Sequence, residues 1–122
     1  MNARVGTDIV AVDRIRALIR ERGTAFLERW FTAHEIGYCF GKAVPSRHFA
    51  ARFAAKEAVL KALPVTWEGP LPWRSIEIAN DPRGVPSVSL SGAILDALPL
   101  NSSGKVTKTR LREMAAVEAA VR

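Results

Sequence analysis

The chain has a single cysteine, Cys39, among its 122 residues. One cysteine cannot form a disulfide within the chain, and such scarcity is typical of proteins from a reducing compartment. No motif that would activate the thiol surrounds Cys39, so we interpret it as a small, partly buried hydrophobe. Cysteine chemistry is therefore not expected to carry the function.

Long apolar runs are missing as well. No stretch approaches the roughly 20 apolar residues that a membrane-spanning helix needs. Arg4 and Asp8 interrupt the apolar residues near the N-terminus, which argues against a secretory signal peptide. We therefore expect a cytoplasmic protein that has no membrane partner.

Acidic residues are outnumbered by basic ones, 12 to 18, and the net charge is +6. A basic surface suits an anionic partner, which can be a nucleic acid, a nucleotide or an acidic protein. Composition does not choose among these three. The length, together with a hydrophobic content of 48%, predicts one globular domain that comprises residues 1–122.

The first part of the chain predicts a strand followed by a helix. Residues 5–12 are rich in β-branched residues and nearly continuous in apolar character, which favours a buried strand with Asp8 as its charged exception. Asp13 has the character of an N-cap for a short helix that ends at Gly23. This helix carries four arginines on or near its outer side: Arg14, Arg16, Arg20 and Arg22.

The middle of the chain predicts two more helices. Thr32 and Glu35 form the capping-box pattern that opens a short helix. Residues 47–63 are predicted to form the longest helix, which Pro64 ends.

The remaining part predicts a hairpin. Residues 75–79 and 88–90 alternate between apolar and polar side chains around a turn at residues 80–84. Residues 91–98 are predicted to form a short helix, and residues 105–121 are open between a helix and two strands. The fold class that follows is α+β.

The long central helix places charges where a core surface is expected. At about 100° per residue, one stripe contains the apolar residues Phe49, Phe53, Leu60 and Leu63. Lys56 lies in the middle of this stripe, and Arg52 and Glu57 lie at its margins. Buried charges are costly unless they are paired, so a bound ligand is a reasonable partner. The alternative is an ordinary amphipathic helix with a surface pair between Glu57 and Lys61.

Asp8 in its apolar strand is a second unusual charge. Alone, it is also consistent with a buried carboxylate that caps a nearby turn or helix. Together, however, Asp8 and Glu57 are two carboxylates on core elements among lysines and arginines. This combination is typical of a divalent-cation site beside a polyphosphate.

These motifs resemble those of the holo-acyl-carrier-protein synthases, which are small 4′-phosphopantetheinyl transferases. The pattern Gly6-x-Asp8-Ile9 is followed by Arg14, and the run RFAAKEAVLKA occupies residues 52–62. Further agreement comes from Phe31-Thr32-x-x-Glu35 and from Gly84-x-Pro86 after the first strand of the hairpin. The resemblance extends from about the fourth residue to the early nineties, with the motifs in the family's order and spacing.

The resemblance implies an activity and a fold. Members transfer 4′-phosphopantetheine from coenzyme A to a serine of an apo acyl carrier protein, with Mg²⁺, and release 3′,5′-ADP. The implied fold is a small α+β domain with a mostly antiparallel sheet packed against a long central helix. The family is typically a homotrimer with active sites at subunit interfaces.

The resemblance also assigns roles to single residues. Asp8 and Glu57 match the residues that hold Mg²⁺ against the coenzyme A diphosphate. Lys61 matches the lysine beside the phosphate and the incoming serine, so Glu57 and Lys61 are the catalytic candidates. Arg52 and Lys56, with Lys61, match basic positions associated with the coenzyme A phosphates. The base that takes the serine proton stays open between Glu57, a metal-bound water and a carboxylate of another subunit.

Arginines of the first helix are implied to meet the acidic carrier protein. Arg14 matches the family's docking residue, and Arg16 and Arg20 are further candidates. A nucleic-acid-binding module would use the same arginines for phosphates. It would not explain acidic residues on core elements, and the chain has no recognition motif of that class.

Near the C-terminus the chain departs from the family pattern. Thr107 to Arg110 stand where members usually carry a Ser-x-x-His motif, and arginine cannot accept a proton at physiological pH. Arg110 is instead a candidate for phosphate binding. Pro64-Val65-Thr66 replaces a glycine-rich turn. A non-catalytic or weakened paralogue that binds coenzyme A or a carrier protein is therefore the alternative function.

Overall fold

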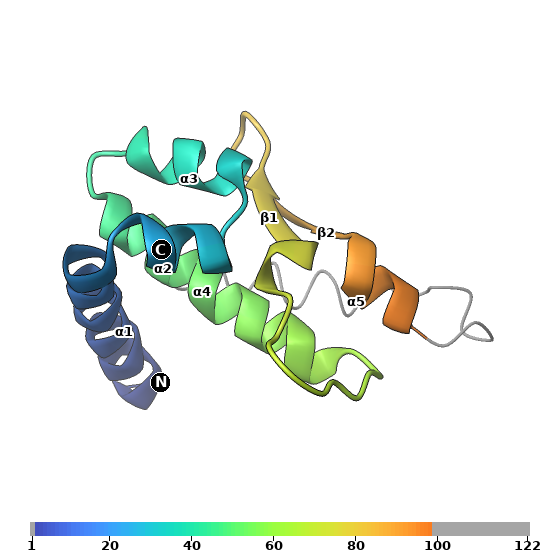
Figure 1. The fold of residues 1–122 in the computed structure, drawn as a ribbon. Coiled ribbons are helices and arrows are strands. Elements are labelled where there is room, and N and C mark those ends of the chain that lie inside the picture. Colours follow the sequence, from blue (N-terminus) through green and yellow to red (C-terminus); the bar gives the residue numbers. More distant parts are fainter. Residues whose placement is uncertain (1, 99–122) are drawn as a thin grey trace.

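The computed structural model describes residues 2–98, with side chains from Val12 onward. Five α-helices, one 3₁₀ helix (η1) and two strands follow one another along this part of the chain (Figure 1). Their bounds are α1 Asn2–Arg22, α2 Thr24–Trp30, α3 Ala33–Phe40, α4 Pro45–Ala62, η1 Trp73–Ser75, β1 Ile76–Asn80, β2 Pro86–Leu90 and α5 Gly92–Ala97. The segment 105–121 and Arg110 lie outside the described residues.

Local signals in the sequence are confirmed along most of this part of the chain. Thr32 accepts a hydrogen bond from the backbone of Glu35, and the Glu35 carboxylate accepts one from the backbone of Thr32, which completes the capping box of α3. Helix α4 begins at Pro45, where proline is tolerated, and ends before Pro64. The hairpin and α5 also form where alternation and spacing predicted them. The fold class is α+β, as expected.

The N-terminal segment differs from the prediction. The strand expected at residues 5–12 is wrong, because these residues form the first turns of α1. Asp13 is likewise no N-cap; it lies inside α1, where its carboxylate accepts a hydrogen bond from Arg16. A strand needs a neighbour for its backbone groups, and in the described residues the sheet comprises β1 and β2 alone. The predicted end at Gly23 is confirmed, with φ at 56°.

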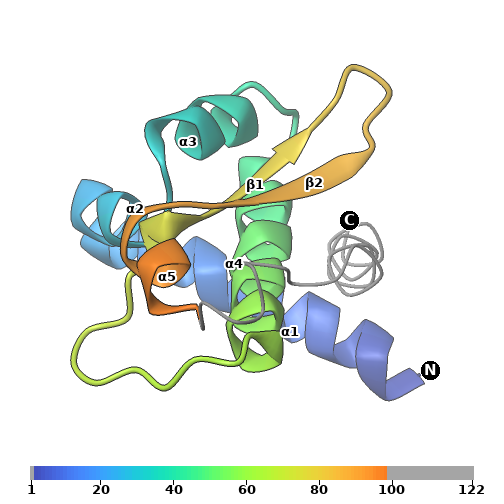
Figure 2. The same cartoon turned by 90° about the vertical axis from the view of Figure 1, so that its right-hand side faces the viewer.

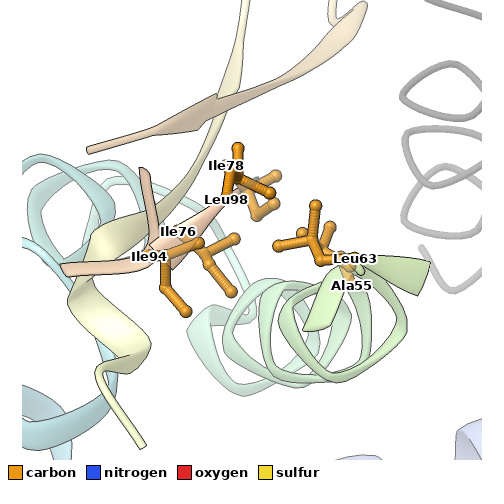
Figure 3. Packing of buried hydrophobic residues seen from close by; sticks show 7 residues of the cluster. Ala55, Leu63, Ile76, Ile78, Ile94 and Leu98 are labelled. Carbon is orange, nitrogen blue, oxygen red and sulfur yellow. The ribbon is translucent and has the colours of Figure 1, made fainter. Parts of the chain in front are cut away.

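Two apolar clusters form along α4. The first three helices cover its N-terminal half, where Ile15, Phe31 and Phe49 are buried together. The hairpin and α5 cover its C-terminal half, and Figure 2 shows the hairpin lying across the helix with its turn projecting beyond it. In Figure 3, Ala55 and Leu63 of α4 face the isoleucines of the strand and of α5.

Within the described residues no helix is both long and apolar enough to cross a membrane.

Candidate functional site

The inward face of α4 carries a buried ion pair. The Lys56 ammonium lies 2.7 Å from the Glu35 carboxylate, and both side chains are fully buried. It also donates to the backbone oxygens of Trp73, at 3.0 Å, and Ile76. An ammonium has three donors, so all of them have acceptors inside the protein. Burial lowers the pKa of Lys56, and the charge of Glu35 acts in the opposite direction.

Glu35 holds the other side of the same pair. One of its oxygens accepts from the Thr32 backbone at 2.8 Å, and the other accepts from the Ile78 backbone at 2.9 Å. The expectation that a buried lysine needs a partner is therefore confirmed. The partner is a carboxylate 21 residues earlier in the sequence, in place of the phosphate that was expected. The sequence showed Glu35 as a residue of the capping box and of the Phe31-Thr32-x-x-Glu35 motif, and nothing in it connected Glu35 with Lys56.

Arg52 is the second buried cation of α4, with 1% of its surface exposed. Its guanidinium donates to the Asn80 side chain at 2.6 Å and lies 4.1 Å from the centre of the Tyr38 ring. Asn80 in turn donates to the backbone of Gly84 at 3.0 Å. Arg52 thus connects the end of β1, through Asn80, with the middle of α4 and with Tyr38 near the end of α3.

A cavity of about 520 Å³ lies at this junction, which we call the hairpin pocket. Its lining residues are Tyr38, Lys42, His48, Asn80, Asp81, Pro82, Arg83 and Gly84. Two of them, Lys42 and Arg83, are basic, His48 carries an imidazole ring and Tyr38 a phenol ring. The acidic member, Asp81, uses one carboxylate oxygen to accept from the Arg83 and Val85 backbones. The volume of the hairpin pocket is that of a small-molecule site. Its basic side chains favour an anionic ligand, and its aromatic ring favours one with a planar ring.

The hairpin pocket could not be assembled from the sequence. Its residues come from α3 and the loop after it, from the first turn of α4, and from the end of β1 with the turn that follows. The sequence predicted the turn at residues 80–84, but it did not indicate which other segments would lie opposite this turn. Lys42, which lies 4.6 Å above the Tyr38 ring, follows α3 and was not singled out.

The outward face of α4 carries Glu57 and Lys61, both exposed and one turn apart. Asp8 lies in α1, and its side chain is outside the described part of the structure. In Figure 2 the first turns of α1 point away from α4. The side chains that are described contain no group of three or more His, Cys, Asp or Glu that could hold a metal ion. An exposed carboxylate does fit Mg²⁺, which one or two carboxylates commonly hold together with substrate phosphates.

The arginines of α1 separate into two groups. Arg14 and Arg22 line a second cavity, of about 450 Å³, together with Arg29 of α2. Arg16 instead donates to Asp13 at 3.1 Å and to Ser46 at 3.3 Å, at the start of α4. Arg14 and Arg16, which were both expected to meet the carrier protein, therefore lie in different surroundings, and Arg29 lines the cavity together with Arg14.

Aromatic rings line the rest of this second cavity, which we call the aromatic pocket. Trp30 is stacked between Phe53 and Trp73, with ring centres 3.9 and 4.0 Å away. Phe26 lies 6.5 Å from Trp30 and lines the pocket as well. Helical periodicity placed Phe53 on an apolar stripe, but no pattern connected it with Trp30 or Trp73. The pocket therefore combines an apolar wall with three guanidinium groups.

Comparison with known proteins gives concordant results. The family model of the 4′-phosphopantetheinyl transferase superfamily matches residues 4–115. The holo-acyl-carrier-protein synthase of Protochlamydia amoebophila is 45% identical over 91 residues, which are 75% of this chain and 75% of that protein. The synthase of Chlorobium limicola is 42% identical over 106 residues, or 87% of this chain and 84% of that protein.

Solved structures agree with the sequence comparison. The crystal structure of the Helicobacter pylori holo-acyl-carrier-protein synthase, in complex with coenzyme A, is 34% identical with a TM-score of 0.58. The match covers 70% of this chain and 71% of that one. The corresponding synthase structure from Neisseria meningitidis has the same TM-score. The motifs around α4, the fold and these matches lead to one conclusion: the chain belongs to the 4′-phosphopantetheinyl transferase superfamily.

Proposed function

We propose that this chain is a transferase that moves 4′-phosphopantetheine from coenzyme A to a serine of an apo acyl carrier protein and releases 3′,5′-ADP. The hairpin pocket is the observation that carries this proposal. It is a basic cavity of about 520 Å³ in a chain whose relative from Helicobacter pylori was solved with coenzyme A.

The hairpin pocket suits the nucleotide end of coenzyme A. That end is a planar base with a 3′-phosphate, joined to a diphosphate. Tyr38 offers an aromatic surface, Lys42 and Arg83 offer charge to phosphate groups, and the His48 ring offers nitrogen atoms for hydrogen bonds. Arg52 contributes indirectly, because its hydrogen bond holds the side chain of Asn80, which lines the pocket. Lys56 has no donor left for this task, so we give it no phosphate contact.

The reacting groups belong to the outward face of α4. The carrier serine hydroxyl attacks the β-phosphoryl of coenzyme A, and the bond to the leaving nucleotide breaks. The Lys61 ammonium is exposed and available to neutralise the charge on the phosphoryl oxygens. Glu57 is a candidate to accept the serine proton. With Asp8 it is also the candidate ligand of Mg²⁺, which would supply further charge neutralisation when bound.

The aromatic pocket suits the carrier protein. Arg14, Arg22 and Arg29 surround an apolar wall, which fits an apolar side chain flanked by acidic residues. Arg16 and Arg20 are exposed on the same helix and extend the basic surface to the side of Ser46. Nucleic acid is the weaker alternative, because Lys42 and Arg83 line one pocket, Arg14, Arg22 and Arg29 line another, and the chain has no nucleic-acid recognition motif.

The active form that we propose is a homotrimer of single-domain chains, residues 1–122, in the cytoplasm. Glu57 and Lys61 lie on an exposed helix face and outside both pockets described here. Phosphoryl transfer profits from a site that excludes water, and a second subunit would provide that cover. Light scattering during size-exclusion chromatography tests the expected mass of three chains.

Intact-mass spectrometry of the carrier protein tests the function directly. The purified chain is incubated with coenzyme A, Mg²⁺ and an apo acyl carrier protein, with and without EDTA. The expected result is a gain of one phosphopantetheine that EDTA prevents. This gain would also show that Arg110, in the place of the family's usual histidine, permits catalysis. Binding of coenzyme A without transfer to any of several carriers would favour the non-catalytic alternative.

A further inference from the structure

Within residues 2–98, where the sheet comprises β1 and β2 alone, the buried pair of Glu35 and Lys56 takes the place of a second neighbour for β1. Odd-numbered residues of the β1 segment bond to β2 or its flanks, as between Ser75 and Ser91. Even-numbered residues therefore present their backbone groups on the other edge. There Glu35 accepts from the Ile78 amide, and Lys56 donates to the Ile76 carbonyl. Two charged side chains thus satisfy backbone groups at an edge of β1 that no other described strand pairs with.

The segment held in this way connects the two pockets. On its N-terminal side, the Trp73 carbonyl accepts from Lys56, and the Trp73 ring stacks on Trp30 in the aromatic pocket. On its C-terminal side, Asn80 lies two residues beyond Ile78 and forms a wall of the hairpin pocket. The pair is buried between these walls and lines neither cavity.

We infer that the Glu35–Lys56 pair is a positioning unit, which holds the walls of both pockets in place by fixing residues 73–78 to α3 and α4. This inference rests on the proposed function only for the identity of the two ligands. Neither side chain touches a substrate. A shift of the fixed segment moves Trp73 and Asn80 together, so loss of the pair impairs both sites at once.

Two other roles for the pair lead to different results. If Lys56 contacted a coenzyme A phosphate directly, its replacement would impair coenzyme A binding and leave carrier binding intact. If the pair only stabilised the fold, variants that remain folded would bind both substrates normally, as often happens when buried ion pairs are replaced. A positioning role of the pair predicts that folded variants bind both substrates more weakly than the wild type does.

The test uses Lys56→Met, Glu35→Gln and the neutral double variant Glu35→Gln/Lys56→Gln. The double variant leaves neither member of the pair charged, so it keeps the test possible if a single variant does not fold. Circular dichroism first defines a temperature at which each variant is fully folded. There we expect the KM values for coenzyme A and for the carrier each to rise about tenfold, which is less than the roughly hundredfold that a displacement of about 1 Å can cost at reacting groups.

A matched control separates positioning from loss of stability. Ile94→Ala truncates a buried side chain that shares an apolar cluster with Ile76 and Ile78, and it leaves the ion pair and its hydrogen bonds to these two residues in place. It should lower the melting temperature and leave both KM values within about twofold. The rise in KM caused by the double variant should be smaller than the sum of the effects of the two single variants, because the two side chains act as one unit.

A second measurement does not depend on activity. Trp30 and Trp73 are stacked at 4.0 Å, so their near-ultraviolet circular dichroism reports the wall of the aromatic pocket. The Lys56 and Glu35 variants should lose this signal toward the level of a Trp73→Phe reference. If the wild-type chain transfers nothing, the proposed function fails, and this signal still decides the positioning role. The inference is overturned if the variants keep both the near-ultraviolet signal and the two KM values of the wild type. It is also overturned if only the KM for coenzyme A changes.

Discussion

Charged side chains lie on both faces of α4, but they are buried on one face and exposed on the other. On the inward face, Arg52 and Lys56 are buried and bound to side-chain and backbone oxygens of the protein. On the outward face, Glu57 and Lys61 are exposed within the same motif. The inward cations hold the hairpin and α3 to the helix, and the outward charges are available for a substrate. A shared motif therefore does not imply a shared role.

The largest effect on stability is expected from Lys56→Met. This change leaves the buried Glu35 carboxylate without its cation, which destabilises proteins by about 3–5 kcal/mol. Lys61→Met on the outward face is the matched control, and its urea midpoint should be nearly that of the wild type. Equal midpoints for the two variants would remove the distinction between the faces.

The largest effect on catalysis is expected on the opposite face. Glu57→Ala should reduce transfer by about a hundredfold or more, because it removes charge from the reacting centre. Its melting temperature should remain within about 2 °C of the wild type, since an exposed side chain has few packing contacts to lose. Carrier modification is followed by mass spectrometry. Near-normal turnover would contradict the assignment of Glu57.

The divided arginines permit a comparison of the same kind. Arg14→Glu should raise the KM for the carrier protein about tenfold and leave that for coenzyme A unchanged, because Arg14 lines the aromatic pocket. Arg16→Glu should have a smaller effect on carrier binding, since Arg16 is engaged with Asp13 and Ser46. Steady-state kinetics with each substrate varied in turn provides both values. An equal rise for the two substrates would argue against docking at this pocket.

The smallest effect concerns the N-terminus of α3. Thr32→Ala removes the acceptor for the Glu35 amide and a hydrogen bond of 2.6 Å to Glu77. Loss of such a cap costs about 1 kcal/mol, which urea unfolding can resolve. Thr24→Ala at the exposed start of α2 is the control and should change the midpoint far less.

Elements with local signals could be predicted from the sequence, and the N-terminal segment could not. The capping box at Thr32, the prolines that bound α4 and the alternation of the hairpin each act within a few residues. The β-branched residues 5–12 gave a misleading signal, because a preference for strands depends on packing against a partner strand. The described sheet offers this segment none, and it forms the first turns of α1.

The residues of the candidate site also differ in how far the sequence could predict them. Glu57, Lys61 and the arginines of α1 were identified from motif and charge alone. Neither pocket was, because their walls come from segments that only the fold brings together. The buried charge of Lys56 was predicted correctly from its helical stripe, but its partner was not.

The sequence by itself determined the order of the elements after α1, the need for a partner at Lys56, and the family to which the chain belongs. The tertiary structure decided which partner is used: Glu35 meets the Ile78 backbone across 43 positions, and Arg52 meets Asn80 across 28. The physical reason is range. Capping, turns and periodicity depend on neighbours in the chain, whereas a buried charge is satisfied by whichever groups packing brings to it.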